Sequence, residues 1–416
     1  MSDSFMLLID FPELRPYLES VRTGLIPLPS RSPEATSKLV VKATKETILT
    51  AKIRGGFHIY RVPIRLNGKA SFGLVSAFRD DYDNPLTIYT PIMEDNGLRH
   101  DLLACLSSNK LEIHFFDEIN RERFAYRSRD LVKSDVERVL ATAEIYPNMD
   151  NFLEAHHAAV AWFSARCEVD DENALEVKLG EPLYDDDFSI VNMEDVHQNL
   201  LYSPILYNLV RNDPGPESED DIAQCLARSF KSGLVLVGPK KQADGLEWAD
   251  IIAIDDEHIV IVQAKDSPNN ETILSRSIDR KALSVKKLAE QGFSQLRGAI
   301  KAIQDGPLEL VTDLSKITVS LEGRTAYGIV IVKEVFPQHN KWYVDMAYAL
   351  TKDKGVMSIL LSYRQLHELT HHLATGKDLV AALTMIFYQA REHGQFADIF
   401  FRDAKRSAHY SFPVNS

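Results

Sequence analysis

The sequence predicts an α+β protein of several domains, with an antiparallel β-rich N-terminal domain and an α/β C-terminal domain. Up to about residue 130, short runs of β-branched and aromatic residues alternate with turn residues, and the hydrophobic period then becomes helical. Beyond residue 217, helical segments alternate with continuous apolar strands. A chain of 416 residues, 45% of them hydrophobic, is long enough for two or three domains, each with its own core.

Residues 1–130 are predicted to form the β-rich domain, which we interpret as a sensor or assembly module. Its connections are too short for crossover helices, and this favours antiparallel pairing. Residues 111–127 have the pattern of a hairpin with its turn near Glu118–Arg121. The other strands are expected at residues 38–44, 46–55, 57–66, 70–79 and 86–92.

Residues 131–216 are predicted to be a helical and acidic connector. The chain carries a net charge of −13, but the segment from Glu168 to Asp221 alone contains sixteen acidic and two basic side chains. Because the rest of the chain is almost neutral, the overall charge does not argue against a nucleic-acid partner. We hypothesise that residues 168–212 restrain the C-terminal domain by competing with DNA for a basic helix.

Residues 217–405 are predicted to form an α/β domain with a mixed sheet flanked by helices, and residues 406–416 a tail. Strands that are apolar without alternation are typical of a sheet that is buried on both faces. The expected helices and strands occupy residues 218–230, 233–238, 250–254, 259–265, 275–304, 326–333 and 356–361, followed by further helices.

One strand pair of this domain leads to the functional prediction. Two apolar runs flank a four-residue polar turn and predict a hairpin in which Ile254 pairs with Ile259. In that register Asp250 lies opposite Gln263 on one face of the sheet, with Cβ atoms roughly 5 Å apart. Lys265 lies on the same face because side chains alternate along a strand. A carboxylate, an amide and an ammonium group therefore gather where an apolar sheet ends.

Metal-assisted phosphodiester hydrolysis is the chemistry that this cluster suits. Carboxylate and neutral oxygens favour a hard cation, Mg²⁺ or Mn²⁺, which polarises a phosphoryl oxygen and activates a bound water. Lys265 is expected to orient that water or to neutralise charge on the phosphate. Because Gln263 is neutral, a further carboxylate is needed, and Glu219 on the inward face of the preceding helix is the candidate. The predicted catalytic residues are thus Asp250, Gln263, Lys265 and Glu219, and all but Lys265 are predicted metal ligands.

Two neighbouring carboxylates are interpreted differently. Ser218 and Asp221 have the spacing of a capping box at a helix start. Glu247 lies at an odd offset from Asp250 and is expected to face away from it unless the strand bulges, because side chains alternate along a strand.

The order of these residues resembles that of the PD-(D/E)xK nuclease superfamily. It is most similar to the Mrr-like restriction endonucleases, in which Gln replaces the first acid of the usual E-x-K. The resemblance covers roughly residues 217–380 and rests on Glu219, Asp250, Gln263-Ala264-Lys265 and Gln295-Leu296-Arg297-Gly298. Glu247-Trp248-Ala249 departs from the family, which often has Pro or Asp-Gly before its acid. The resemblance implies a restriction-endonuclease-like fold and a Mg²⁺-dependent endodeoxyribonuclease, acting in bacterial defence against foreign DNA as a homo-oligomer.

The helix that follows the strand pair is basic. Positive side chains on it could hold phosphates without reading sequence, and a solvated helix face is the competing interpretation. DNA is the expected partner and RNA the alternative. The predicted nucleic-acid-binding residues are Arg276, Arg280, Lys286, Lys287 and Arg297.

A second motif, His367-Glu368-Leu369-Thr370-His371, matches H-E-x-x-H and gives a zinc metalloprotease as an alternative function, with Glu392 as a third ligand. The apolar stripe of this helix runs through Leu366, Leu369 and Leu373, so both histidines are expected to face outward on a surface helix. A nuclease-fold module that binds DNA without cutting it is the other alternative.

Three widely spaced cysteines fit neither a disulfide framework nor a Cys-based zinc site. A cytoplasmic location is therefore expected. No apolar run approaches the roughly 18 residues of a membrane span, and the first residues do not have the pattern of a secretion signal.

Overall fold

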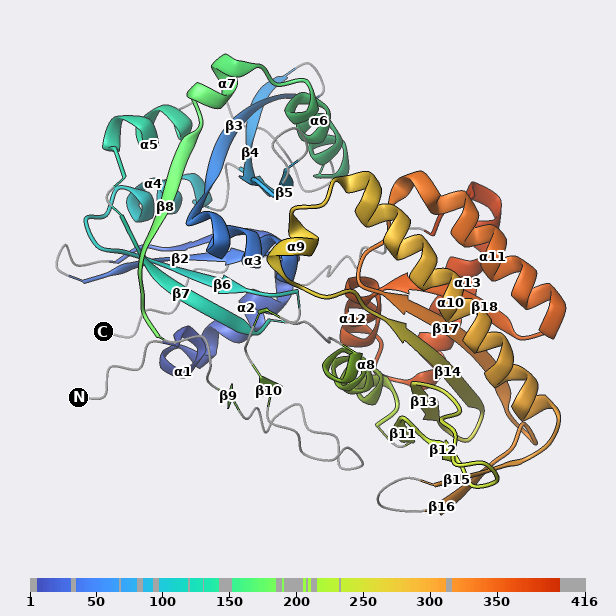
Figure 1. Ribbon diagram of the computed structural model, residues 1–416. Coiled ribbons are helices and arrows are strands. Elements are labelled where there is room, and N and C mark those ends of the chain that lie inside the picture. The colour runs from blue at the N-terminus through green and yellow to red at the C-terminus, as the bar shows by residue number, and fades with distance from the viewer. Residues whose placement is uncertain are drawn as a thin grey trace.

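The computed structural model contains two units that lie side by side, each built around its own sheet (Figure 1). The predicted α+β class is confirmed. None of the helices in the described part of the chain has both the length and the apolar composition of a membrane-spanning helix. The structure describes residues 6–30, 35–66, 69–80, 85–92, 97–118, 120–129, 131–141, 152–184, 189–190, 205–206, 209–210, 215–231, 233–311 and 316–396.

The N-terminal unit is organised around an eight-stranded sheet of order β1-β2-β6-β7-β8-β3-β4-β5. Neighbouring strands are antiparallel, as predicted, with the exception of β2 and β6, which are parallel because the long chain between them makes a crossover. The strands are β1 (Gly24–Leu28), β2 (Ser37–Lys42), β3 (Gly56–Leu66), β4 (Lys69–Phe78), β5 (Leu86–Pro91), β6 (Leu111–Phe116), β7 (Glu122–Ser128) and β8 (Leu175–Pro182).

Helix α3 (Lys45–Arg54) occupies the place of the strand that was predicted at residues 46–55. The side chain of Thr44 accepts a hydrogen bond from the Thr47 amide and begins the helix, and Gly55, with φ of +69°, ends it. These caps override the strand preference of its β-branched residues, of which Thr47, Ile48 and Thr50 are buried and Ile53 is exposed. The other helices of this unit are α1 (Leu7–Asp10), η1 (Pro12–Leu14), α2 (Arg15–Ser20), α4 (Leu98–Leu106), α5 (Lys133–Val139), α6 (Phe152–Ser164) and α7 (Glu168–Glu172).

Strand β8 comes from the segment that was predicted to be a connector. Its residues are buried at Leu175, Val177 and Leu179 and exposed at the positions between them, which is the period of a half-buried strand. Because β8 lies between β7 and β3, the N-terminal unit extends beyond residue 130. Farther on, β9 (Ser189–Ile190) pairs with β10 (Ile205–Leu206). Five of the eleven acidic residues of the predicted restraining segment 168–212, and the tail 406–416, lie outside the described residues.

The C-terminal unit contains a five-stranded mixed sheet of order β11-β13-β14-β17-β18. The predicted hairpin register is confirmed, since Ile254 pairs with Ile259 and Ile252 with Ile261. The strands are β11 (Leu234–Val237), β13 (Ile251–Ile254), β14 (His258–Lys265), β17 (Thr325–Val332) and β18 (Met357–Ser362). Strands β12 (Lys240–Lys241), β15 (Leu308–Val311) and β16 (Lys316–Val319) form a separate small sheet.

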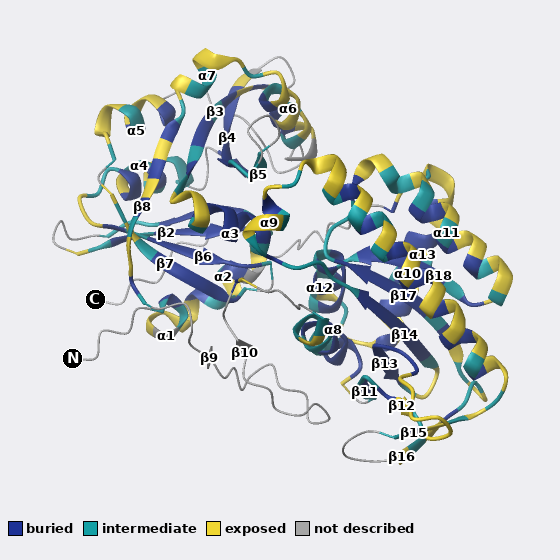
Figure 2. Cartoon of the chain, viewed as in Figure 1, coloured by how far each residue is buried: buried dark blue, intermediate teal, exposed yellow. Residues whose placement is uncertain are grey.

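Helices cover both faces of the five-stranded sheet, so its strands are buried while the outer helix faces are exposed (Figure 2). Helices α10 (Ile278–Gln304) and α11 (Asn340–Lys354) pack on one face. The other face packs against α8 (Gly215–Ser229), α12 (Tyr363–His372) and α13 (Gly376–His393). The short helices α9 (Glu271–Leu274) and η4 (Pro337–His339) complete the unit.

Buried ion pairs join the two units. Arg121, at the β6–β7 turn, donates from Nη1 and Nη2 to the two carboxylate oxygens of Asp221 on α8, each over 2.7 Å. Lys45 Nζ approaches Asp221 Oδ2 to 3.1 Å. Asp221 was predicted to cap its helix, but α8 begins at Gly215, so this carboxylate lies in the second turn and is available to the N-terminal unit.

Two further ion pairs extend this interface. Lys333, just after β17, lies 2.9 Å from Glu46 of α3, and Lys281 of α10 pairs with Asp80 after β4. Leu274 of α9 is buried among the core residues of the N-terminal unit. The interface therefore contacts α8, α10 and the end of β17, which are the elements that surround the predicted site.

Candidate active site

The predicted cluster of Asp250 and Lys265 is present at the edge of the sheet where β14 ends. Lys265 Nζ lies 3.0 Å from Asp250 Oδ2 and donates to the Ala264 carbonyl over 2.8 Å. The same Asp250 oxygen accepts a hydrogen bond from the Ala264 amide at 2.7 Å. The exposed fractions of the two charged side chains are only 15% and 12%, so their attraction is screened less than that of a surface pair.

Gln263 is buried beside this pair. With its side-chain nitrogen turned toward Asp250, the amide donates to Asp250 Oδ1 at 3.0 Å and to Gln295 Oε1 of α10 at 3.2 Å. Half a turn of the same amide places its oxygen beside the carboxylate of Asp250. In that orientation the two oxygens would repel each other unless a hard cation lay between them, so a metal site here would require this turn of the amide.

Two more carboxyl groups approach the cluster. Burial, together with the negative charges of Asp250 and Glu247, raises the pKa of Glu219 to about 7. Burial and the charge of Asp250 also raise the pKa of Glu247, whose side chain forms a hydrogen bond with that of Asp250. The structure thus brings the predicted Glu219 to the site and adds Glu247, which was expected to face away.

The alternation rule fails for Glu247 because this residue is not part of β13. Glu247 forms an isolated antiparallel bridge with Lys240, and β13 begins only at Ile251. The signal in the sequence is the turn-forming pair Asp244-Gly245, which reverses the chain before Glu247.

Carboxylate and amide oxygens are the types of ligand that a divalent cation such as Mg²⁺ prefers. Burial, and after it the repulsion between carboxyl groups, raises the pKa values of Glu219 and Glu247, and a cation between these groups would relieve that repulsion. Within the described residues, no three His, Cys, Asp or Glu side chains are arranged to hold a metal ion by themselves. A cation here would therefore also need the amide oxygen of Gln263 and water or phosphate oxygens, as Mg²⁺ commonly does.

Gly292 allows α10 to pack directly against the site. A Cβ atom at this position would lie 2.6 Å from Val330 Cγ1 and 3.3 Å from Lys265 Cγ. Gly292→Ala is therefore expected to push α10 away from the sheet and to lower the free energy of unfolding by about 1–3 kcal/mol.

Urea denaturation measures this effect, and Gly298→Ala on the same helix is the matched control. A Cβ atom at Gly298 meets no atom within 4 Å, so that variant is expected to be neutral or slightly stabilised. Equal stabilities of the two variants would contradict the packing argument.

The predicted phosphate-binding residues lie in different surroundings on and before α10. Arg280 and Lys287 are exposed and Arg276 is partly buried. Lys286 lies over the ring of Trp342, 4.9 Å from its centroid, and Arg297 pairs with Asp353 at 3.5 Å. These last two side chains contact α11, so Arg280 and Lys287 are the members of the set that are best placed to meet a nucleic acid.

The H-E-x-x-H motif lies on α12, as a helix, but His367 does not face outward as expected. His367 is 5% exposed because α12 packs tightly on α8. This burial lowers the pKa of His367 well below its ordinary value, and the positive charge of Arg228 lowers it further. Glu368 forms an ion pair with Arg22 of the N-terminal unit. Among the described residues, Glu392 does not join the two histidines in a metal-ligand group.

The N-terminal unit reaches the site from one side. A cavity of about 20 Å³ is lined by Lys45 and Glu118 of that unit and by Lys265 and Asp266 of the other. Such a volume holds about one water molecule. On this side, the N-terminal unit therefore covers Lys265.

Comparisons with known proteins do not identify the function of the chain. No family model, no curated protein and no solved structure matches the chain.

Proposed function

We propose that the C-terminal unit is a metal-dependent nuclease of the PD-(D/E)xK type, with an Mrr-like Q-x-K site, that hydrolyses the phosphodiester bonds of DNA. The observation that carries the proposal is the contact of Asp250, Gln263 and Lys265 at one sheet edge, with Lys265 Nζ 3.0 Å from Asp250 Oδ2. The mixed sheet with α8 on one face and α10 on the other is compatible with a restriction-endonuclease-like fold.

Each residue of the cluster has a role in this proposal. Mg²⁺ or Mn²⁺, when bound, would polarise a phosphoryl oxygen and lower the pKa of a water. Asp250, Glu219 and the amide oxygen of Gln263 would hold the cation. An ammonium group has three donors, and the one of Lys265 that is not used by Asp250 and Ala264 would serve the attacking water or the charge that develops on the phosphate.

The setting of the activity follows from the resemblance. We propose that the enzyme acts in the cytoplasm, in defence against foreign DNA, and that a homo-oligomer brings two sites to the two strands of a duplex. Arg280 and Lys287 would contact the phosphate backbone, which gives affinity without sequence preference.

A plasmid-cleavage assay tests the proposal. Purified full-length protein is incubated with supercoiled plasmid in Mg²⁺, in Mn²⁺ or in EDTA, and with single-stranded RNA in parallel. Cleavage of DNA in either metal and none in EDTA is expected. Binding of DNA without cleavage in any metal would favour the non-catalytic module. Cleavage of RNA alone would make RNA, and not DNA, the substrate of the nuclease.

The affinity of the site for metal is expected to fall with decreasing pH below about 7. The raised pKa of Glu219, about 7, means that a proton must leave this carboxyl before it can bind a cation at lower pH. One released proton corresponds to about tenfold weaker binding per pH unit. Calorimetric titration of Mn²⁺ at several pH values measures this slope, and Glu219→Gln is expected to flatten it. A flat profile in the unmodified protein would exclude Glu219 as a ligand.

The zinc metalloprotease is the weaker candidate. A protease of that class needs its glutamate as a general base and both histidines at the metal. Here Glu368 is paired with Arg22, and His367 is buried against α8. Zinc retained by the purified protein and lost in His371→Ala would favour this candidate.

A further inference from the structure

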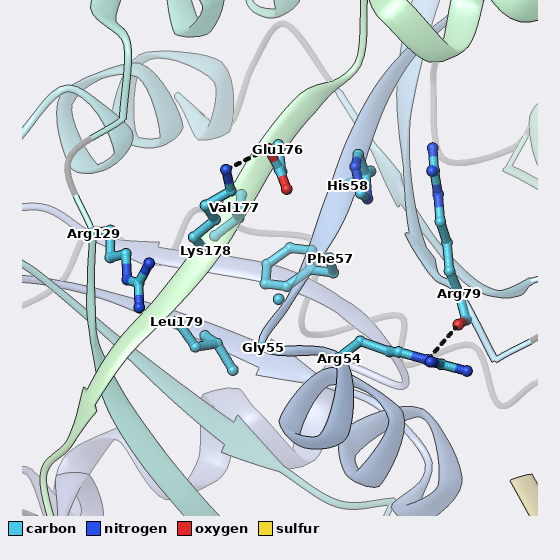
Figure 3. A pocket seen from close by; sticks show the side chains of 11 residues that line it. Arg54, Gly55, Phe57, His58, Arg79, Arg129, Glu176, Val177, Lys178 and Leu179 are labelled. Carbon is cyan, nitrogen blue, oxygen red and sulfur yellow. Dashed lines mark hydrogen bonds and ion pairs between the residues drawn. The ribbon is translucent and has the colours of Figure 1, made fainter.

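A cavity of about 440 Å³ opens on the N-terminal unit, and none of the residues of the candidate active site lines it. Its walls come from the end of α3, the first residues of β3, the middle of β8, and the residues that follow β4 and β7 (Figure 3). The volume is within the range of about 300–1,000 Å³ that is typical of small-molecule sites.

Positive charge dominates the lining of this cavity. Arg54, Arg79, Arg129 and Lys178 line it together with one carboxylate, that of Glu176, which lies 3.0 Å from Lys178 Nζ. Arg54 Nε donates to the Arg79 carbonyl at 3.1 Å, which fixes the position of its guanidinium group (Figure 3). The lining therefore attracts an anion with more than one negative charge.

The floor of the cavity contains uncharged groups. The side chains of Phe57 and Val177 are buried in the core of this unit, with 2% and 0% of these residues exposed, so both line the cavity mainly with their main chain. His58 Nδ1 is buried with no hydrogen-bond partner among the described residues. Gly56 keeps β3 close to β8, because a Cβ atom there would lie 2.2 Å from the Val177 carbonyl oxygen. The charged rim is therefore the part of the lining that selects the ligand, and it favours a compact anion with several negative charges.

We propose that this cavity binds a small phosphate-bearing molecule of about the size of a mononucleotide. Guanidinium groups form paired, charge-assisted hydrogen bonds with phosphate oxygens, and Arg54 and Arg129 provide two of them. The guanidinium of Arg79 also lines the cavity, but it donates to the Tyr60 hydroxyl at 3.1 Å and lies 3.7 Å from Asp171 Oδ1.

The same elements connect this cavity with the interface between the units. Arg54 lies at the end of α3, and Lys45 at the start of this ten-residue helix contacts Asp221 of α8. Arg79 precedes Asp80, which pairs with Lys281 of α10. Figure 1 shows α3 at the boundary between the two units. A ligand that shifts α3 or residues 79–80 would therefore change the contacts that lie beside Lys265.

Calorimetric titration of the full-length protein with pyrophosphate and with ATP tests the binding site. We expect both to bind, and we expect Arg54→Ala and Arg129→Ala each to weaken binding by about tenfold, the loss of one charge-assisted contact. Glu176→Gln is expected to tighten binding because it removes the one carboxylate of the lining. Lys133→Ala, on α5 with 75% of its side chain exposed, is the matched control and is expected to leave the affinity unchanged.

The same titrations can overturn the proposal. Absence of binding for both compounds at millimolar concentration would do so, as would affinities that do not respond to Arg54→Ala and Arg129→Ala. Duplex DNA is titrated in parallel. If only DNA binding depends on these arginines, the cavity is part of a nucleic-acid surface and not a small-molecule site.

Hydrogen exchange measures the connection to the interface without any catalytic readout. ATP is expected to change the exchange of amides in α3 and in α8, and Arg54→Ala is expected to remove that change. Protection confined to residues 54–58 and 176–179 would leave the binding site in place and overturn the connection. Regulation of plasmid cleavage by ATP would rest on the proposed nuclease function. The binding and exchange measurements do not, so they test the ligand site even if the protein does not cleave the plasmid.

Discussion

Lys265→Ala is expected to lower the rate of metal-dependent plasmid cleavage by about 10²–10³-fold, and Asp250→Asn by a similar factor. In the proposed function Lys265 would supply the positive charge beside the phosphate. Asp250, whose carboxylate is almost buried, pairs with Lys265 and would also hold the cation. Because Asp250→Asn keeps the shape of the side chain, loss of activity in this variant reflects lost charge and not a cavity. Single-turnover cleavage at saturating protein measures the chemical step.

The matched controls are Lys341→Ala and Asp345→Ala, which break an ion pair of the same 3.0 Å separation on the exposed face of α11. Both are expected to cleave as the unmodified protein does. Cleavage by a folded Lys265→Ala protein at the unmodified rate would overturn the proposed function.

Arg121→Ala is expected to lower the free energy of unfolding by about 3–5 kcal/mol, the usual effect of removing one partner of a buried ion pair. The Arg121 and Asp221 side chains are 9% and 6% exposed, and the carboxylate of Asp117 also lies 3.3 Å from Arg121 Nε. The substitution leaves the carboxylates of Asp117 and Asp221 buried without this partner. The expected loss in the free energy of unfolding is therefore larger than the net contribution of the ion pair to stability. Urea denaturation followed by circular dichroism gives the difference.

Arg127→Ala provides the comparison on β7. Arg127 lies 3.7 Å from Glu181, but these side chains are 62% and 84% exposed, so the expected loss is less than about 1 kcal/mol. Equal effects of the two arginine substitutions would contradict a buried, stabilising contact between the units.

Arg121→Ala also tests whether the N-terminal unit limits access to the site. Lys45 and Glu118 line the small cavity beside Lys265, so a weakened interface is expected to expose the Lys265 ammonium group. Labelling with an amine-reactive reagent, followed by peptide mass spectrometry, measures this exposure. Faster labelling of Lys265 in Arg121→Ala than in Arg127→Ala is the expected result, and equal rates would show that the site is reached from another side.

Local patterns predicted the hairpin of the candidate site correctly. A polar turn between two apolar runs leaves one register that keeps both runs in the core, and that register places Asp250 next to Gln263. The same local reasoning failed for residues 46–55, where a threonine cap and a glycine stop outweigh the β-branched composition. It also failed for Glu247. The side-chain alternation of β13 was extended back to this residue, but Glu247 lies outside the strand, in a bridge with Lys240.

The sequence by itself determined the α+β class, the paired strands β13 and β14, and the cluster of Asp250, Gln263 and Lys265, because these depend on the period of side chains over a few neighbouring residues. The tertiary structure decided which distant segments meet. Only the packing of α8 against the N-terminal unit brings Asp221 to Arg121, and only the insertion of β8 between β7 and β3 gathers Arg54, Arg129 and Lys178 around one cavity. These residues are 49 or more positions apart in the sequence, and no local period records their proximity.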